Sequence, residues 1–367
     1  MVACTLPQLV PRAAALPGQY LAGFASPAVS TAGLYLWEDW KPDGNGGSAI
    51  ALNVFKCSTA SLLFLVAHFA QPLFGGCATL PTASAAWGLV VSSLLGIVIG
   101  DSLWLWALGA LGAEQTILLT ALQPFLAAMV GWAMLGQNPG REVYGGMAVA
   151  AIGIYLAQLK DVAEFRRRFF WWVPTSPNRE ADGAPMQAAD EAGSSAPAAP
   201  TKFVARHKLK IGMFVQLVNV LLDQIGAAIT RVHGVGLSAW TISLYRFGFA
   251  SVVGLLLYGA LLCRRPRCSL AALPPQFAVP WSRMDARKWL HVLLGVFMVT
   301  FLCPAMNAYS LFGMDLGVWA LLGALGPAWS PPVKYLFKKE ATSRFGWAGA
   351  TIAAAGAAIT AWVSHNG

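Results

Sequence analysis

The feature that most constrains the fold is a series of ten continuous runs of mainly apolar residues. A helix needs roughly 20 such residues to cross the hydrocarbon core of a membrane. The runs are continuous rather than alternating, which is wrong for the strands of a membrane barrel. We therefore expect an all-α integral membrane protein that crosses the bilayer several times. The expected spans are 18–37, 49–70, 88–110, 114–135, 143–160, 211–230, 238–262, 289–311, 315–336 and 345–363.

The composition supports the same class. Of the 367 residues, 57% belong to the AVILMFWYC set and only 11% are charged. A soluble domain of this length could not hide so much apolar side chain, so a soluble enzyme, a disordered chain and a coiled coil are excluded. The net charge of +9 does not imply a nucleic-acid partner, because Lys and Arg collect in the cytoplasmic loops of membrane proteins.

Residues 161–208 differ from the rest of the chain. They open with the basic and aromatic run RRRFFWW and continue with a stretch rich in Pro, Ala, Ser and acidic residues. Such a composition buries too little apolar area to offset the entropy of ordering, which predicts a disordered soluble linker. The linker divides the chain into a first half, 1–160, and a second half, 209–367.

The two halves share features at fixed spacings, which indicates an internal repeat. Near the start of each half, Lys56 aligns with Arg246, and the residue offset between these two is called the short spacing. Later in each half, Pro124 aligns with Pro327, and the larger residue offset between these two is called the long spacing. The features that recur at the long spacing are Leu122-Gln123-Pro124 with Leu325-Gly326-Pro327, Arg141 with Arg344, Gly146 with Gly349, and Gly153 with Gly356.

Five spans in each half is an odd number, so the second half must enter the membrane from the opposite side. We therefore expect ten transmembrane helices arranged as two inverted five-helix repeats. This is the architecture of secondary transporters, whose binding sites lie near the membrane midplane between the repeats. Two similar bundles inserted in opposite directions provide two near-equivalent packings, each open to one face, as alternating access requires.

The segment that begins GIVIGDSLWLW and ends GGMAVAAIGIYL resembles the core of an EamA-type repeat of the drug/metabolite transporter superfamily. The sequence departs from that pattern at Gln137, where the family usually has Glu, and at Pro304, which aligns with Asp101. The resemblance implies a transporter of small organic molecules. The positions that carry it are Gly100-Asp101, Gly112-Ala113, Pro124, Leu135-Gly136-Gln137 and Gly145-Gly146 in the first half, and Pro327, Glu340, Gly349 and Gly356 in the second.

Four charged residues lie well inside the expected spans: Lys56, Asp101, Asp223 and Arg246; Glu114 lies nearer a span end. A charge at a helix centre costs about 2.5–3.5 kcal/mol on insertion scales, so each needs a partner or a function. Lys56 and Arg246 either attract an anionic substrate or only reach polar groups near broken helices. Asp101 and Asp223 either carry a coupling proton or form fixed ion pairs with the two cations.

Pro124 and Pro327 lie inside apolar spans, where proline removes a backbone hydrogen bond. Matching proline interruptions in two halves point to a transporter binding site, although ordinary kinked helices give the same pattern. Aromatic and amide residues around them could line a cavity for an organic molecule, or serve packing and the membrane interface. These further substrate-binding candidates are Trp104, Gln123, Asn307, Tyr309 and Trp329.

Gly146 and Gly153, with Gly349 and Gly356, place small residues on one helical face. In lipid such a face favours close helix contact, either inside the protein or across a homodimer. The sequence contains no phosphate loop, no nucleophile–base set and no metal-ligand cluster, so we expect no catalytic residues, no metal and no cofactor.

We therefore expect a secondary transporter whose partners are a small-molecule substrate and membrane lipid. Lys56 and Arg246 favour an anionic substrate, such as a sugar nucleotide or a phosphorylated metabolite, over an amino acid or an amphiphile. The alternative is a non-transporting membrane receptor or scaffold with the same fold, which the absence of Glu at position 137 would allow.

Overall fold

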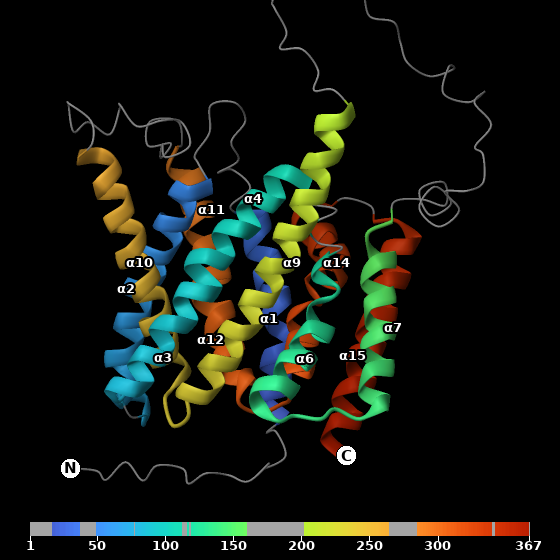
Figure 1. The fold of residues 1–367 in the computed structure, drawn as a ribbon, viewed down its shortest axis with the longest axis horizontal. Helices are drawn as coiled ribbons and strands as arrows, with labels where there is room; N and C mark the ends of the chain where they lie inside the picture. Colours follow the sequence, from blue (N-terminus) through green and yellow to red (C-terminus); the bar gives the residue numbers. More distant parts are fainter. Residues whose placement is uncertain are drawn as a thin grey trace, which may run out of the picture.

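The computed structural model describes residues 17–36, 49–76, 78–111, 116, 119–159, 202–263, 285–339 and 342–366. Throughout these residues the secondary structure is helical, with turns and no strands (Figure 1). The helices of the first half are α1 (Pro17–Leu36), α2 (Ala49–Ala70), η2 (Gln71–Phe74), α3 (Ala83–Ser93), η3 (Leu94–Gly100), α4 (Asp101–Leu111), α6 (Gln123–Leu135) and α7 (Arg141–Ala157). Those of the second half are α9 (Lys202–His233), α10 (Ala239–Cys263), α11 (Ala286–Val296), η6 (Phe297–Leu302), α12 (Cys303–Leu311), α13 (Leu316–Gly323), α14 (Gly326–Lys338) and α15 (Arg344–Asn366).

Six helical segments among the described residues are long and apolar enough to cross a membrane. Of the other expected spans, 143–160 overlaps α7, which has 17 residues. The range 18–37 overlaps α1, which has 20 residues but includes Pro27 and several hydroxyl side chains. The six segments are Ala51–Phe74, Ala83–Trp104, Lys210–His233, Ala239–Ala260, Ala286–Leu311 and Arg344–His365.

The two spans that carry the aligned prolines are interrupted rather than kinked. The helix α6 begins at Gln123, so that Pro124 lies in its first turn, and α14 begins at Gly326 with Pro327 in its first turn. Before α14, the short helix α13 ends at Gly323 and two turn residues follow. Proline is tolerated in a first turn because the N–H that it lacks has no helical acceptor there. The expected span 315–336 therefore consists of two helices, α13 and α14, rather than one continuous helix.

The second half begins earlier than expected. The helix α9 begins at Lys202, so residues 202–208 are helical and do not belong to a disordered linker. The sequence KFVARHK contains no Gly or Pro, and nothing in it stops the helix from extending beyond its apolar part. The rest of the expected linker, 161–201, lies outside the described residues, and so does Glu114.

Helix bounds recur at the two spacings seen in the sequence. At the long spacing, which relates Pro124 to Pro327, the starts of α3, α6 and α7 correspond to those of α11, α14 and α15, respectively. The ends of α6 and α14 correspond in the same way. At the short spacing, which relates Lys56 to Arg246, the start of α2 corresponds to that of α10.

The residues that follow α6 and α14 are also equivalent at the long spacing. Both take a left-handed conformation, with φ values of 64° at Gly136 and 52° at Lys339. Glycine adopts this conformation without strain, whereas Lys339 is the one non-glycine residue with positive φ in the described chain. Each helix is therefore followed by a residue in the left-handed conformation, although one is Gly and the other is Lys.

The first helix of each half packs against the other half. α1 contacts α11, η6, α12 and α14, whereas α9 contacts α3, η3, α4 and α6. The two halves are therefore interlocked. Each contributes a helix to a bundle whose other members come from the opposite half.

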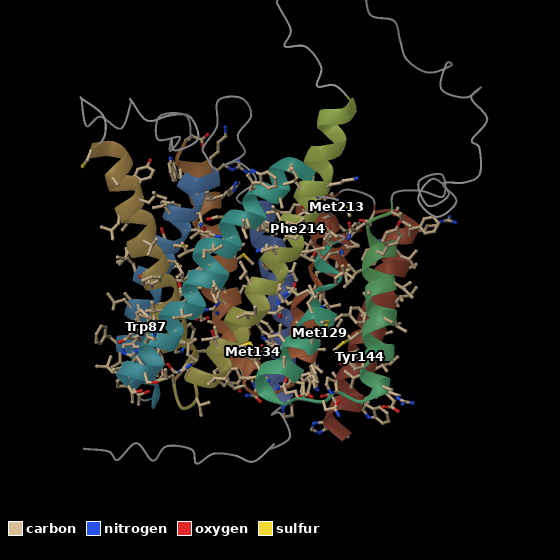
Figure 2. The ribbon with its side chains drawn as sticks, viewed as in Figure 1. Trp87, Met129, Met134, Tyr144, Met213 and Phe214 are labelled. Atoms are coloured by element: carbon tan, nitrogen blue, oxygen red, sulfur yellow. The ribbon has the colours of Figure 1, made fainter. Side chains whose placement is uncertain are left out.

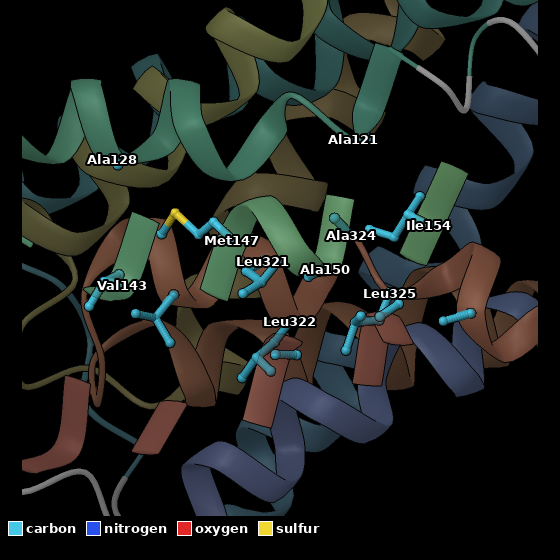
Figure 3. Packing of buried hydrophobic residues seen from close by; sticks show 14 of the residues in the cluster. Ala121, Ala128, Val143, Met147, Ala150, Ile154, Leu321, Leu322, Ala324 and Leu325 are labelled. Carbon is cyan, nitrogen blue, oxygen red and sulfur yellow. The ribbon is translucent and has the colours of Figure 1, made fainter. Parts of the chain in front are cut away.

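The closest helix pair is α7 with α15, which run antiparallel (Figure 1). A Cβ added at Gly153 would lie 2.2 Å from the backbone nitrogen of Ala353. One added at Gly349 would lie 2.1 Å from the backbone nitrogen of Ala157. The small residues thus let two backbones touch inside the protein, as close packing in lipid requires. Figure 3 shows the apolar cluster around this pair, including Met147 and Ile154 from α7 and Leu321 and Leu322 from α13.

Large apolar side chains also cover the outside of the bundle (Figure 2). Those labelled in the figure include Trp87, with 70% of its area exposed, Phe214 with 67% and Met129 with 63%. A soluble monomer rarely exposes continuous apolar surface of this extent. In a bilayer the same side chains face the lipid chains.

Candidate functional site

The site is organised around two π-helical turns at equivalent places. η3 directly precedes Asp101, and η6 directly precedes Cys303. A π-helix widens the turn, so it is rare, and it occurs frequently at functional sites. The two segments begin at Leu94 and Phe297, which are equivalent at the long spacing. Nothing in the apolar periodicity of the sequence distinguishes such a turn from ordinary α-helix.

A polar side chain from the opposite half contacts the end of each π-helical turn. Asn219 of α9 donates its amide Nδ2 to the carbonyl oxygen of Gly100 at 2.8 Å. Ser26 of α1 donates its hydroxyl to the carbonyl oxygen of Cys303 at 3.4 Å and to Oδ1 of Asn307 at 2.8 Å. Ser26 and Asn219 are both buried. These contacts hold the wide turns of one half against the first helix of the other.

Lys56 and Asp101 form a direct ion pair beside η3. Nζ of Lys56 lies 2.7 Å from Oδ2 of Asp101, and their side chains are 14% and 31% exposed. Of the roles that the sequence left open for Asp101, the structure places this carboxylate in an ion pair. The pair joins α2 to the start of α4.

Asp223 and Arg246 both lie near the same π-helical turn, but they form no ion pair with each other. A Cβ added at Gly96 in η3 would lie 3.2 Å from Nη2 of Arg246 and 3.6 Å from Oδ1 of Asp223. No nitrogen–oxygen contact of 4.0 Å or less joins these two described residues. The two interact electrostatically with each other and with Asp101. The four charged side chains therefore form one cluster, with two members from each half.

Several buried polar atoms in the cluster, or on the helix α9 that carries Asp223, have no hydrogen-bond partner among the described residues. They are Nε of Arg246, Oε1 of Gln224 and both amide atoms of Gln216. Nε2 of Gln224 donates to Oδ2 of Asp223 at 3.2 Å. Because an unsatisfied buried polar atom costs about 1–3 kcal/mol, such atoms call for an explanation, such as a ligand.

The sequence reasoning missed Gln216, Asn219 and Gln224. The first two share one face of α9 with Asp223, at positions i, i+3 and i+7. Three polar side chains on one face of an otherwise apolar helix are a signal that the sequence does contain. Attention to charged residues alone overlooks it, because two of the three side chains are neutral amides.

The remaining predicted residues do not all reach the charged cluster. Trp329 donates its indole N–H to the carbonyl oxygen of Phe24 at 3.2 Å, so it packs against α1. Tyr309 is 45% exposed. Trp104 and Gln123 are partly buried, as is Pro327, whereas Pro124 is buried. The structure thus places Asn307, Trp329 and the α1 contacts in one group, and the four charges around η3 in another.

Gln137, the departure from the family pattern, joins the two halves. Its Oε1 accepts the backbone N–H of Leu316 at 2.9 Å, at the first residue of α13. Arg231 of α9 donates to the neighbouring carbonyl oxygen of Met314. An amide oxygen accepts such a bond as a carboxylate does. The absence of Glu at 137 therefore does not remove this contact.

A hollow of about 290 Å³ lies between α1, α13 and α15. None of the predicted substrate-binding residues lines it. The described residues also contain no group of three or more His, Cys, Asp or Glu that could hold a metal ion. The lining residues of the hollow are Tyr20, Leu21, Phe24, Leu322, Ala357, Ala358 and Ala361.

One known protein family matches the first half of the chain. Residues 28–159 match the EamA-like transporter family. Residues 28–159 therefore resemble an EamA-like transporter domain. The resemblance seen in the first half of the sequence is confirmed, and with it an integral, multi-pass membrane location. The members of this family are transporters rather than enzymes, so the match over residues 28–159 suggests a membrane transporter of the drug/metabolite transporter superfamily.

One protein of known crystal structure has a similar fold. It aligns with 95% of this chain and 98% of its own chain, with a TM-score of 0.63 and 12% sequence identity. At this identity the likeness concerns the fold alone. No curated protein sequence matches the chain.

Proposed function

We propose that the protein is a secondary transporter that moves a small organic metabolite by alternating access. Its two halves are inverted five-helix repeats, and the substrate binds between them at the charged cluster around η3. The observation that carries this proposal is the position of the cluster. The first half contributes Lys56 and Asp101 to this cluster, and the second half contributes Asp223 and Arg246. All four lie around the π-helical turn η3.

The repeat is supported by the helix bounds and by reciprocal contacts. Gly153 approaches the carbonyl oxygen of Gly349, and Gly356 approaches that of Gly146. Because Gly146 is equivalent to Gly349 at the long spacing, as Gly153 is to Gly356, each contact is the image of the other. Reciprocal contacts of this kind are typical of a two-fold axis. With antiparallel helices, that axis lies across the helix direction, as inverted repeats require.

The pair α2 and α10 gives the same indication at the short spacing. Ser58 and Ser251 are hydrogen-bonded through their hydroxyls at 2.9 Å. A Cβ at Gly248 would lie 3.5 Å from the hydroxyl of Ser61. At this spacing Gly248 is equivalent to Ser58, and Ser251 to Ser61, so these two contacts are also images of each other. Two helix pairs thus support one axis between the halves.

The proposal is tested by uptake into proteoliposomes that contain the full chain. The probes are radiolabelled hexose phosphates, sugar nucleotides and amino acids. We expect at least one probe to accumulate above the level in protein-free liposomes, and Arg246→Ala to abolish that accumulation. Uptake of none of these probes would contradict the proposal and leave a receptor or scaffold. Lys288→Ala, at an exposed position in the first turn of α11, is the control and should transport normally.

A further inference from the structure

The charges around η3 differ in how completely they are paired. Lys56 is neutralised by Asp101 at 2.7 Å. Arg246 and Asp223 both approach Gly96, yet their charged groups make no direct contact of 4.0 Å or less. The two charges therefore do not form an ion pair with each other. Both lie near Gly96, which has no side chain to fill the space beside them. An unclosed pair of opposite charges inside a membrane protein needs a further partner or a purpose.

The net charge of the four residues bears on what that partner can be. Two cations and two carboxylates sum to zero. A phosphorylated substrate would bring two further negative charges into a site of low dielectric that has no unmatched cation. Burying a charge without compensation costs several kcal/mol. A ligand that carries one positive and one negative group would instead close the open pair without changing the net charge.

Unpartnered hydrogen-bonding atoms are available for the same ligand. Nε of Arg246 makes no hydrogen bond in the described chain, so the guanidinium has an N–H to give to a carboxylate. Arg commonly binds carboxylates through two parallel N–H bonds. Gln216, fully buried and with both amide atoms unpartnered, lies on the face of α9 that carries Asp223. It can bond to polar groups farther along the ligand.

We propose that the substrate is a zwitterion, whose carboxylate is bound by Arg246 and whose ammonium group is bound by Asp223. This proposal rests on the transport function proposed above. It names the substrate class of the same site, and it reverses the preference for an anion that Lys56 and Arg246 suggested when taken alone.

The test uses the full chain in detergent and measures thermal stabilisation by the proteinogenic amino acids. The best amino acid is then compared with its N-acetyl derivative, which lacks the ammonium group, and with its decarboxylated amine. We expect both analogues to bind at least tenfold more weakly than the parent. Equal binding of either analogue would overturn the proposal. Uptake of a hexose phosphate without any response to amino acids would also overturn it, while leaving the transport function intact.

Two variants test which residue binds the ammonium group of the ligand and which binds its carboxylate. With Asp223→Asn, the N-acetyl derivative should bind as well as the parent amino acid, because the ammonium group loses its partner. With Arg246→Gln, the amine should bind as well as the parent. If either variant keeps the wild-type preference, the assignment of that charge is wrong.

A third variant tests whether the ligand binds beside Gly96. Gly96→Ala puts a methyl group 3.2 Å from Nη2 of Arg246, and it should weaken amino-acid binding at least tenfold. Gly145→Ala is the matched control, because a Cβ there meets nothing within 4 Å. Unchanged binding by a folded Gly96→Ala protein would contradict the proposed position.

Discussion

Replacing Lys56 by Met is expected to destabilise the protein by about 3 kcal/mol, because the change leaves the carboxylate of Asp101 without its ammonium partner. That ammonium group now lies 2.7 Å away. Removing one partner of a buried ion pair costs about 3–5 kcal/mol, because the remaining charge is uncompensated. The lower end applies here, since 31% of the Asp101 side chain is exposed. The loss is measured as the change in unfolding free energy in detergent.

A double variant separates the ion pair from the packing of the lysine stem. Lys56→Met with Asp101→Leu removes both charges and should recover most of the lost stability, because no buried charge is then left alone. Lys288→Met is the same chemical change at an exposed position of α11, and it should alter stability by less than about 0.5 kcal/mol. A double variant as unstable as the single one would show that the pair contributes nothing.

Substituting Gly153 and Gly145 by Ala should have effects of opposite sign, although both lie on α7. A Cβ at Gly153 would lie 2.2 Å from the backbone nitrogen of Ala353. The backbones of α7 and α15 must then separate, at a cost of about 2–3 kcal/mol. A Cβ at Gly145 meets nothing within 4 Å. There Ala should stabilise the helix by up to about 1 kcal/mol.

The readout for this pair is the midpoint of thermal unfolding in detergent. Gly349→Ala provides an independent check from the other helix, because its Cβ would lie 2.1 Å from the backbone nitrogen of Ala157. It should lower the midpoint as Gly153→Ala does. Equal midpoints for Gly153→Ala and Gly145→Ala would mean that α7 and α15 are not in backbone contact.

Helix positions were largely predictable because they follow from continuous apolar length, which the sequence states directly. The range expected for 49–70 coincides with α2, and the range 238–262 differs from α10 by one residue at each end. The breaks at Pro124 and Pro327 were not predictable. Proline is compatible both with a kink inside a helix and with the first turn of a new one. Tertiary packing decides between the two.

The candidate site was predictable only in part. Charge inside an apolar span is a local property, so Lys56, Asp101, Asp223 and Arg246 could be found from the sequence. Their pairing could not, because Asp101 and Lys56 lie 45 residues apart and the π-helical turn that places Gly96 between Asp223 and Arg246 has no periodic signature. The places of the aromatic candidates could not be predicted for a related reason. Trp329 and Tyr309 have the chemistry to line a cavity, but helix rotation places one against α1 and exposes the other.

A site shared by the two halves requires that they be inserted in opposite directions. This is tested most directly by labelling single cysteines in intact cells with a reagent that does not cross membranes. The positions are Asn138, exposed between α6 and α7, and Lys339, exposed at the equivalent end of α14. We predict that one of them is labelled only from outside the cell and the other only after the membrane is opened. Labelling of both from the same side would contradict the inverted arrangement, and with it the shared site between the halves.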